Sequence, residues 1–91
     1  MTFQMLASEG RMISFMVNHL DAEHFDRYVR TWVYQCDAHL RKMMPKSSFT
    51  KHFYQLWSNA DKIDELIFEQ LLYIIQGMAA AESYSNRQSA G

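Results

Sequence analysis

The sequence contains little cysteine, proline or glycine, and each scarcity excludes a class of structure. A single cysteine, Cys36, cannot form a disulfide within the chain, so a disulfide-stapled scaffold is excluded and a reducing compartment is the simplest setting. The three glycines stand at positions 10, 77 and 91, and they are too far apart to form a phosphate-binding loop. One proline and few glycines leave little to interrupt a helix, which favours an all-α fold.

The chain also lacks an excess of charge and any long apolar run. Nine basic and ten acidic residues give a net charge of −1, so no overall field directs the protein toward nucleic acid or makes it a DNA mimic. No run approaches the roughly 18 apolar residues of a membrane span, and we expect no membrane association. The first residues do not form a basic segment followed by an apolar one, as a secretion signal would. We therefore expect a cytoplasmic location and no secretion.

Large and adaptable apolar side chains make up much of the sequence. Of the 91 residues, 48% are hydrophobic, which indicates a globular chain and not a disordered one. The length allows one domain with a modest core, which burial against a partner would extend. Seven of these apolar residues are methionines, which suit irregular contact surfaces.

Apolar residues recur at helical spacing in four segments, which we expect over residues 2–20, 22–40, 48–57 and 60–82. Asp21 is placed as an N-cap, Pro45 ends the second segment, and Ser47 or Ser48 caps the third. Ser58 with Asp61 resembles a capping box for the last segment, and Gly10 suggests a bend in the first. The prediction is a compact all-α bundle of four to five short helices, in a single domain over residues 1–84 followed by a flexible polar tail over 85–91.

Each segment has a stripe of residues expected in the core. The second segment should carry Asp26, Arg27, Arg30 and Asp37 on its opposite, solvent-facing side, with Asp26 and Arg30 paired across one turn. The core stripes comprise Leu6, Ile13, Val17 and Leu20; Phe25, Val29, Trp32, Val33 and Cys36; Phe49, Phe53, Leu56 and Trp57; and Ile63, Ile67, Leu71, Ile74 and Met78, widened by Phe68, Leu72 and Ile75.

The first segment has a second apolar stripe that its own core does not need. On a helical wheel, Met5, Met12, Phe15 and Met16 lie about 60–160° around the axis, away from the core stripe, with Ser8 and His19 on the same face. One interpretation is a helix wedged between others and apolar all round. The other is a face that binds a partner, because a chain this short can hardly bury a terminal helix completely.

Signs of catalysis or metal binding are weak. Cys36 lies on an apolar stripe, where a buried and unactivated thiol is inert. Asp61, Asp64 and Glu65 stand at a helix start, where carboxylates stabilise the dipole. His19 and His24 lack the four-residue spacing of a helical ligand pair. We expect no enzyme, no cofactor and no metal site.

Basic residues gather around Pro45: Arg41, Lys42, Lys46 and Lys51, flanked by His39 and His52. A helix-turn-helix would place the following segment in a DNA groove, but that segment offers few groups to read bases. A solvated loop is the preferred interpretation. The four cations remain candidate contacts to DNA phosphates, and a small DNA-binding regulator remains an alternative function.

Three stretches carry a resemblance to a known family: "ISFMVNHLDAEHFD", "HLRKMMPKSSFTKHFYQLW" and "ADKIDEL". In length, order and apolar pattern the chain resembles the AsiA-like anti-sigma factors of T-even-type phages over most of its length. The linker around Pro45 needs small insertions to align, and the terminal "SNRQSAG" differs from the family's tail, which leaves a co-activator site there unsupported.

The resemblance implies an all-helical protein that binds the C-terminal, −35-reading region of the bacterial primary sigma factor within RNA polymerase. With a phage co-activator, such a protein moves transcription from host to phage promoters in the bacterial cytoplasm. The matching positions imply sigma contacts at Met12, Phe15, Met16 and His19, with Tyr34 from the second segment. A homodimeric adaptor or chaperone that covers its methionine-rich face with a second copy is a further alternative.

Overall fold

The structure is a computed structural model that describes the backbone of residues 2–16 and 19–90 and the side chains of 2–16 and 19–84. Four helices make up this part of the chain: α1 (Phe3–Met16), α2 (Ala22–Met43), α3 (Ser48–Ser58) and α4 (Glu65–Ala90). No strand occurs among the described residues. The prediction of a compact all-α bundle is confirmed, with four helices.

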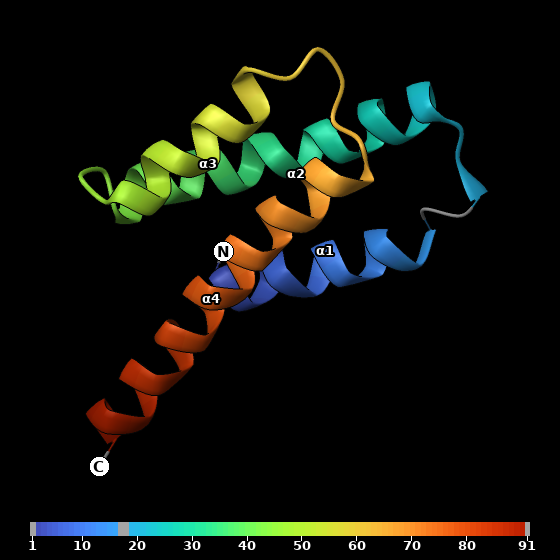
Figure 1. Ribbon diagram of the computed structural model, residues 1–91. Helices are drawn as coiled ribbons and strands as arrows, with labels where there is room; N and C mark the ends of the chain where they lie inside the picture. Colours follow the sequence, from blue (N-terminus) through green and yellow to red (C-terminus); the bar gives the residue numbers. More distant parts are fainter. Residues whose placement is uncertain (1, 17–18, 91) are drawn as a thin grey trace.

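α1 packs against both α4 and α2, and α3 packs against both α2 and α4. α3 folds back along α2 as an antiparallel hairpin, since the Thr50 hydroxyl donates to the Met44 carbonyl at the turn and the Trp57 ring packs on Tyr34 at the far end. α4 packs along α1 and also contacts both helices of the hairpin, and its C-terminal part extends past the other helices (Figure 1). The Glu82 carboxylate of α4 accepts the backbone N–H groups of Phe3 and Gln4, which caps the start of α1.

Helix boundaries follow local capping chemistry, with one correction. Asp21 caps α2 by accepting the backbone N–H of His24 at 2.9 Å, and Ser47 caps α3, as expected. The predicted capping box at residues 58–61 is wrong: α4 starts at Glu65, and the Asp64 carboxylate accepts the N–H of Ile67 at 2.9 Å. The backbone of α4 continues through Ala90, beyond the expected end at residue 82, and the mobility of the tail stays a prediction.

The core contains most of the residues that periodicity selected, and it contains others. Val17 lies outside the described residues, while Leu20, Leu56, Trp57, Ile67 and Met78 are half-buried against the core. Phe49 is half exposed, which corrects its place in a core stripe. The buried apolar residues are Phe3, Leu6, Ala7, Ile13, Phe25, Val29, Trp32, Val33, Cys36, Leu40, Phe53, Ile63, Phe68, Leu71, Leu72, Ile74 and Ile75.

Asp37 is buried, which corrects its assignment to the solvent-facing side of α2. Only 7% of its surface is exposed. Its carboxylate pairs with the Arg41 guanidinium at 2.8 Å, one turn later, and accepts the indole N–H of Trp57 at 3.3 Å. These partners compensate the loss of hydration, and they attach α3 to α2.

Gly10 marks a close contact between helices, and α1 stays helical through this position. It is buried within α1, and a Cβ atom at this position would come within 2.8 Å of the Trp32 ring and 2.5 Å of the Leu72 side chain. The Trp32 ring has little room to move, because its indole N–H donates to the Leu6 carbonyl at 2.8 Å. The glycine therefore lets α1 approach α2 and α4 closely.

Replacing Gly10 with valine is expected to lower the free energy of unfolding by about 1–3 kcal/mol, because the added branches overpack this contact. The exposed Gly77 of α4 provides the matched control, since nothing lies within 4 Å of its Cβ position. Gly77→Val should be neutral or stabilising, because valine has the higher helix propensity. Urea unfolding measures both, and equal effects at the two positions would contradict the close-contact explanation.

Asp26 connects α2 to the segment before α4. Its carboxylate accepts the Ile63 backbone N–H at 2.6 Å and pairs with Arg30 at 3.0 Å, as the four-residue spacing predicted. Partial burial favours the protonated form, but these two donors together outweigh it and hold the pKa of Asp26 below its ordinary value.

The depressed pKa predicts a stability component that acid removes. A carboxyl group whose pKa is lower in the folded state stabilises the fold above the unfolded value of about 3.9, and the contribution disappears as pH falls through the folded pKa. Asp26→Asn is expected to lower the free energy of unfolding by about 1–2 kcal/mol at pH 7 and by much less near pH 2.5. Urea unfolding at both pH values measures the difference, and an equal loss at both would contradict it.

Candidate functional site

The second apolar stripe of α1 is exposed and is not wedged between other helices. Phe15 has 80% of its surface exposed, Met12 65% and Met16 42%, and Met5 is also exposed nearer the start of the helix. Since the opposite side of α1 holds the buried residues Leu6 and Ile13, the helix has one face in the core and one apolar face in solvent. Such a grouping of exposed apolar side chains is typical of a binding surface.

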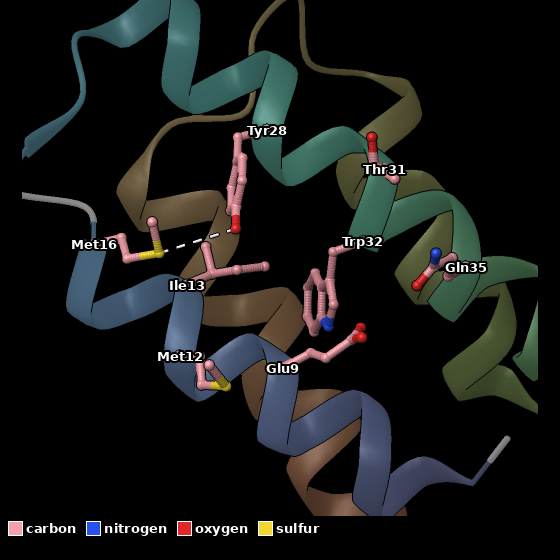
Figure 2. A pocket seen from close by; sticks show the side chains of 8 residues that line it. All are labelled: Glu9, Met12, Ile13, Met16, Tyr28, Thr31, Trp32 and Gln35. Atoms are coloured by element: carbon pink, nitrogen blue, oxygen red, sulfur yellow. Dashed lines mark hydrogen bonds between the residues drawn. The ribbon is translucent and has the colours of Figure 1, made fainter.

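This face borders a groove between α1 and α2, hereafter the α1–α2 groove, of about 450 Å³. Figure 2 shows Met16 and Tyr28 at one end, Ile13 and Trp32 between the helices, and the polar side chains of Glu9 and Gln35 at the other end. The groove thus offers an apolar interior with a carboxylate at one end. Its lining residues are Glu9, Met12, Ile13, Met16, Tyr28, Thr31, Trp32 and Gln35.

The interior of the groove is rigid, while its α1 edge is adaptable. Trp32 is fixed by its 2.8 Å hydrogen bond to the Leu6 carbonyl and by edge contact with the Phe68 ring. At the edge, the Tyr28 hydroxyl lies 3.9 Å from the Met16 sulfur, which is a weak contact. Methionine side chains change rotamer readily, so the edge can adjust to a partner over a fixed interior.

The structure brings together some of the predicted sigma contacts and separates others. Met12, Phe15 and Met16 lie on one face, and His19 is exposed just beyond the end of α1. Tyr34 does not line the α1–α2 groove. Its ring packs on Trp57 of α3 at 5.3 Å, and it borders a separate, more polar hollow that includes Arg30 and Lys62. A contact through Tyr34 would need a partner that extends across α2.

The α2 wall of the groove, formed by Tyr28, Thr31 and Gln35, was missed by the sequence reasoning. These residues lie three and four positions apart on α2 and are all exposed. Their spacing shows that they share a face, but nothing local indicates that α1 lies beside it. Only the packing of α1 against α2 makes them part of one surface.

Cys36 and His24, two groups with catalytic or metal-binding chemistry, are held in structural contacts. Cys36 is fully buried as expected, and this burial raises the pKa of its thiol far above the ordinary value. The His24 ring pairs with Asp21 at 2.8 Å beside the α2 cap. Over the described ranges 2–16 and 19–84, no group of three or more His, Cys, Asp or Glu side chains is placed to hold a metal ion.

The basic residues around Pro45 lie at the turn of the α2–α3 hairpin. Arg41 pairs with Asp37 and lies over the Tyr54 ring, while Lys42, Lys46 and Lys51 are exposed. In a helix-turn-helix the two helices cross at about 90–120°. Here α3 runs back along α2, so the hairpin does not have that arrangement.

Comparison with known proteins adds no relative. No protein-family model, curated protein or solved structure matches this chain significantly. None of the helices in the described part of the chain has both the length and the hydropathy needed to cross a bilayer. The groove and the exposed α1 face are therefore the features of this chain from which its function is inferred.

Proposed function

We propose that this protein is an anti-sigma factor that binds the C-terminal, −35-reading region of a bacterial primary sigma factor within RNA polymerase. It would act in the cytoplasm of a bacterial host, and would redirect the polymerase from host to phage promoters, with a phage co-activator as a further partner. The observation that carries the proposal is the exposed row of Met12, Phe15 and Met16 beside an open groove with a fixed tryptophan inside.

The geometry suits recognition of a helix by helix-in-groove packing. An apolar side chain of the partner would enter between Ile13 and Trp32, while Phe15 would enter a pocket on the partner. Aromatic anchors of this kind supply most of the energy of small interfaces. No bond is made or broken in this mechanism, and no cofactor takes part.

The polar end of the groove supports a DNA-reading partner. Helices that read DNA present arginine and lysine side chains to phosphates and bases. A basic side chain beside the apolar anchor would meet the Glu9 carboxylate at the edge of the groove. Binding at this end of the groove would mask a promoter-reading surface, because Glu9 would engage the same basic side chains that the partner uses to contact DNA.

Affinity capture tests the proposal directly. The tagged protein is incubated with bacterial lysate, and the captured chains are identified by mass spectrometry. We expect the primary sigma factor and the polymerase subunits, and the purified C-terminal region of sigma should then compete with the capture. Recovery of neither sigma nor polymerase would contradict the proposal.

Sedimentation at two concentrations tests the rival in which a second copy covers the same face. A homodimeric adaptor would sediment as a dimer and would not dissociate when sigma is added. An anti-sigma factor that dimerises only when free would dissociate, because the partner and the second copy compete for one face. The stoichiometry with sigma present therefore separates the two functions.

A further inference from the structure

Three exposed lysines, Lys42, Lys46 and Lys51, lie around the turn of the α2–α3 hairpin, and we infer that they bind the phosphate backbone of duplex DNA. These three residues are called the hairpin tip below. The inference extends the proposed function, because a protein seated on the −35-reading region of sigma lies beside the promoter duplex. The contact itself belongs to this chain and is testable without sigma.

The distribution of charge along the chain is uneven although its sum is small. Residues 38–60 contain four cations, Arg41 and the three lysines of the hairpin tip, and no Asp or Glu. The whole chain has a net charge of −1. The hairpin therefore concentrates positive charge at one end of a molecule whose remaining charge is negative, which is the electrostatic pattern of a local phosphate contact.

The lysines of the hairpin tip are free of internal partners within the described residues. Arg41 is neutralised by Asp37 at 2.8 Å, but no ion pair involves Lys42, Lys46 or Lys51. All three side chains are exposed. Their charges are thus available to an external anion.

The stability of the helices accounts for a lysine at position 42, but it does not account for Lys46 and Lys51. Lys42 lies in the last turn of α2, where a cation stabilises the negative end of the helix dipole. Lys46 precedes α3 and Lys51 lies near its start, where the positive end of the dipole disfavours a cation. Lys46 and Lys51 therefore lower the stability of α3 slightly. Binding of an external anion would offset this cost.

The available groups fit phosphates better than the carboxylates of an acidic protein. The charge of Arg41 is already paired with Asp37 through its Nε, and its guanidinium carbon lies 4.9 Å from the centre of the Tyr54 ring. The remaining donors are lysine ammonium groups on flexible stems, which act as point charges toward spaced phosphates. In the adjoining hollow, Thr50 donates its hydroxyl to the Met44 carbonyl and so is not available to read a base.

The hairpin tip is separate from the α1–α2 groove. Gln35, the groove residue nearest the hairpin tip along α2, and Lys42 are seven residues apart on one helix, which corresponds to about 10 Å at 1.5 Å per residue. The two surfaces share no residue. A variant at one should leave the other intact, so failure of the DNA contact and failure of sigma binding are distinguishable.

Fluorescence anisotropy of the full chain with a labelled 20-base-pair duplex tests the inference, over salt concentrations from 20 to 200 mM. Neutralising three phosphates gives a slope of log K against log salt of about −2.7, at about −0.9 for each. The triple variant Lys42→Gln/Lys46→Gln/Lys51→Gln should lose at least about tenfold in affinity at low salt and most of that slope. The matched control Arg11→Gln/Arg27→Gln/Lys62→Gln removes the same charge elsewhere, and should keep both.

Three outcomes would overturn the inference. The first is no binding of the wild-type protein to duplex at 20 mM salt. The second is an equal loss in the control triple variant, which would show an effect of net charge alone. The third is binding to polyglutamate with none to the duplex, which would assign the hairpin tip to an acidic protein. Capture of sigma by the Lys-to-Gln variant, measured in parallel, reports on the proposed function independently.

Discussion

Phe15→Asp is expected to weaken binding to the sigma factor strongly while leaving the fold intact. Phe15 is the most exposed large apolar side chain of α1, so the free energy of unfolding should change by less than about 0.5 kcal/mol. In the complex, the new carboxylate would be buried without a partner, which costs about 2–5 kcal/mol. That range corresponds to a loss of about 30- to 5,000-fold in affinity. Isothermal titration with the C-terminal region of sigma measures it.

Tyr73→Asp is the matched control for this substitution. Tyr73 has 78% of its surface exposed, and it lies on α4, outside the α1–α2 groove. The control should bind sigma normally, and circular dichroism should show unchanged helicity in both variants. Normal binding by Phe15→Asp would remove the exposed α1 face from the interface. Loss of helicity in that variant would show that the stripe belongs to the core.

Phe68→Ala is expected to cause the largest loss of stability, about 3–5 kcal/mol. Phe68 is 1% exposed, and its ring makes edge contacts with Phe25 at 5.8 Å and Trp32 at 5.4 Å. It therefore holds α4 against α2 beneath the groove. A domain of this length has a total stability of about 5–14 kcal/mol, so the substitution would remove a large part of it.

Phe49→Ala removes the same atoms from α3 and provides the comparison. Phe49 is 50% exposed, and its loss should cost about 1 kcal/mol or less. Urea unfolding of both variants gives the two free energies directly. Equal costs at the two positions would mean that the aromatic cluster of Phe25, Trp32 and Phe68 is not the centre of the core.

Much of the fold was predictable because it follows from short-range patterns. The burial of Val29, Trp32, Val33 and Cys36 follows from their helical spacing on α2. Asp21 and Pro45 mark helix ends through chemistry that involves only their neighbours in the chain. The same reasoning separated the two faces of α1, and the exposed one is the candidate site.

The features that were missed depend on contacts between distant residues. The burial of Asp37 depends on Trp57, 20 residues later, and the close approach at Gly10 depends on Trp32 and Leu72. Local spacing contains no information on either. Tyr34 was implied by family resemblance alone, and the hairpin places it beside Trp57, away from the groove.

The exposed α1 face and the α1–α2 groove should together form the surface that binds the −35-reading region of sigma. An NMR titration of the isotope-labelled protein with that purified region tests it most directly, by methyl shifts of the methionines and the indole signal of Trp32. We predict that the largest changes occur at Met12, Met16 and Trp32, while Met43 and Met44 at the hairpin turn change little. Unchanged spectra, or changes concentrated on α3 and α4, would exclude the α1–α2 groove as the sigma-binding surface.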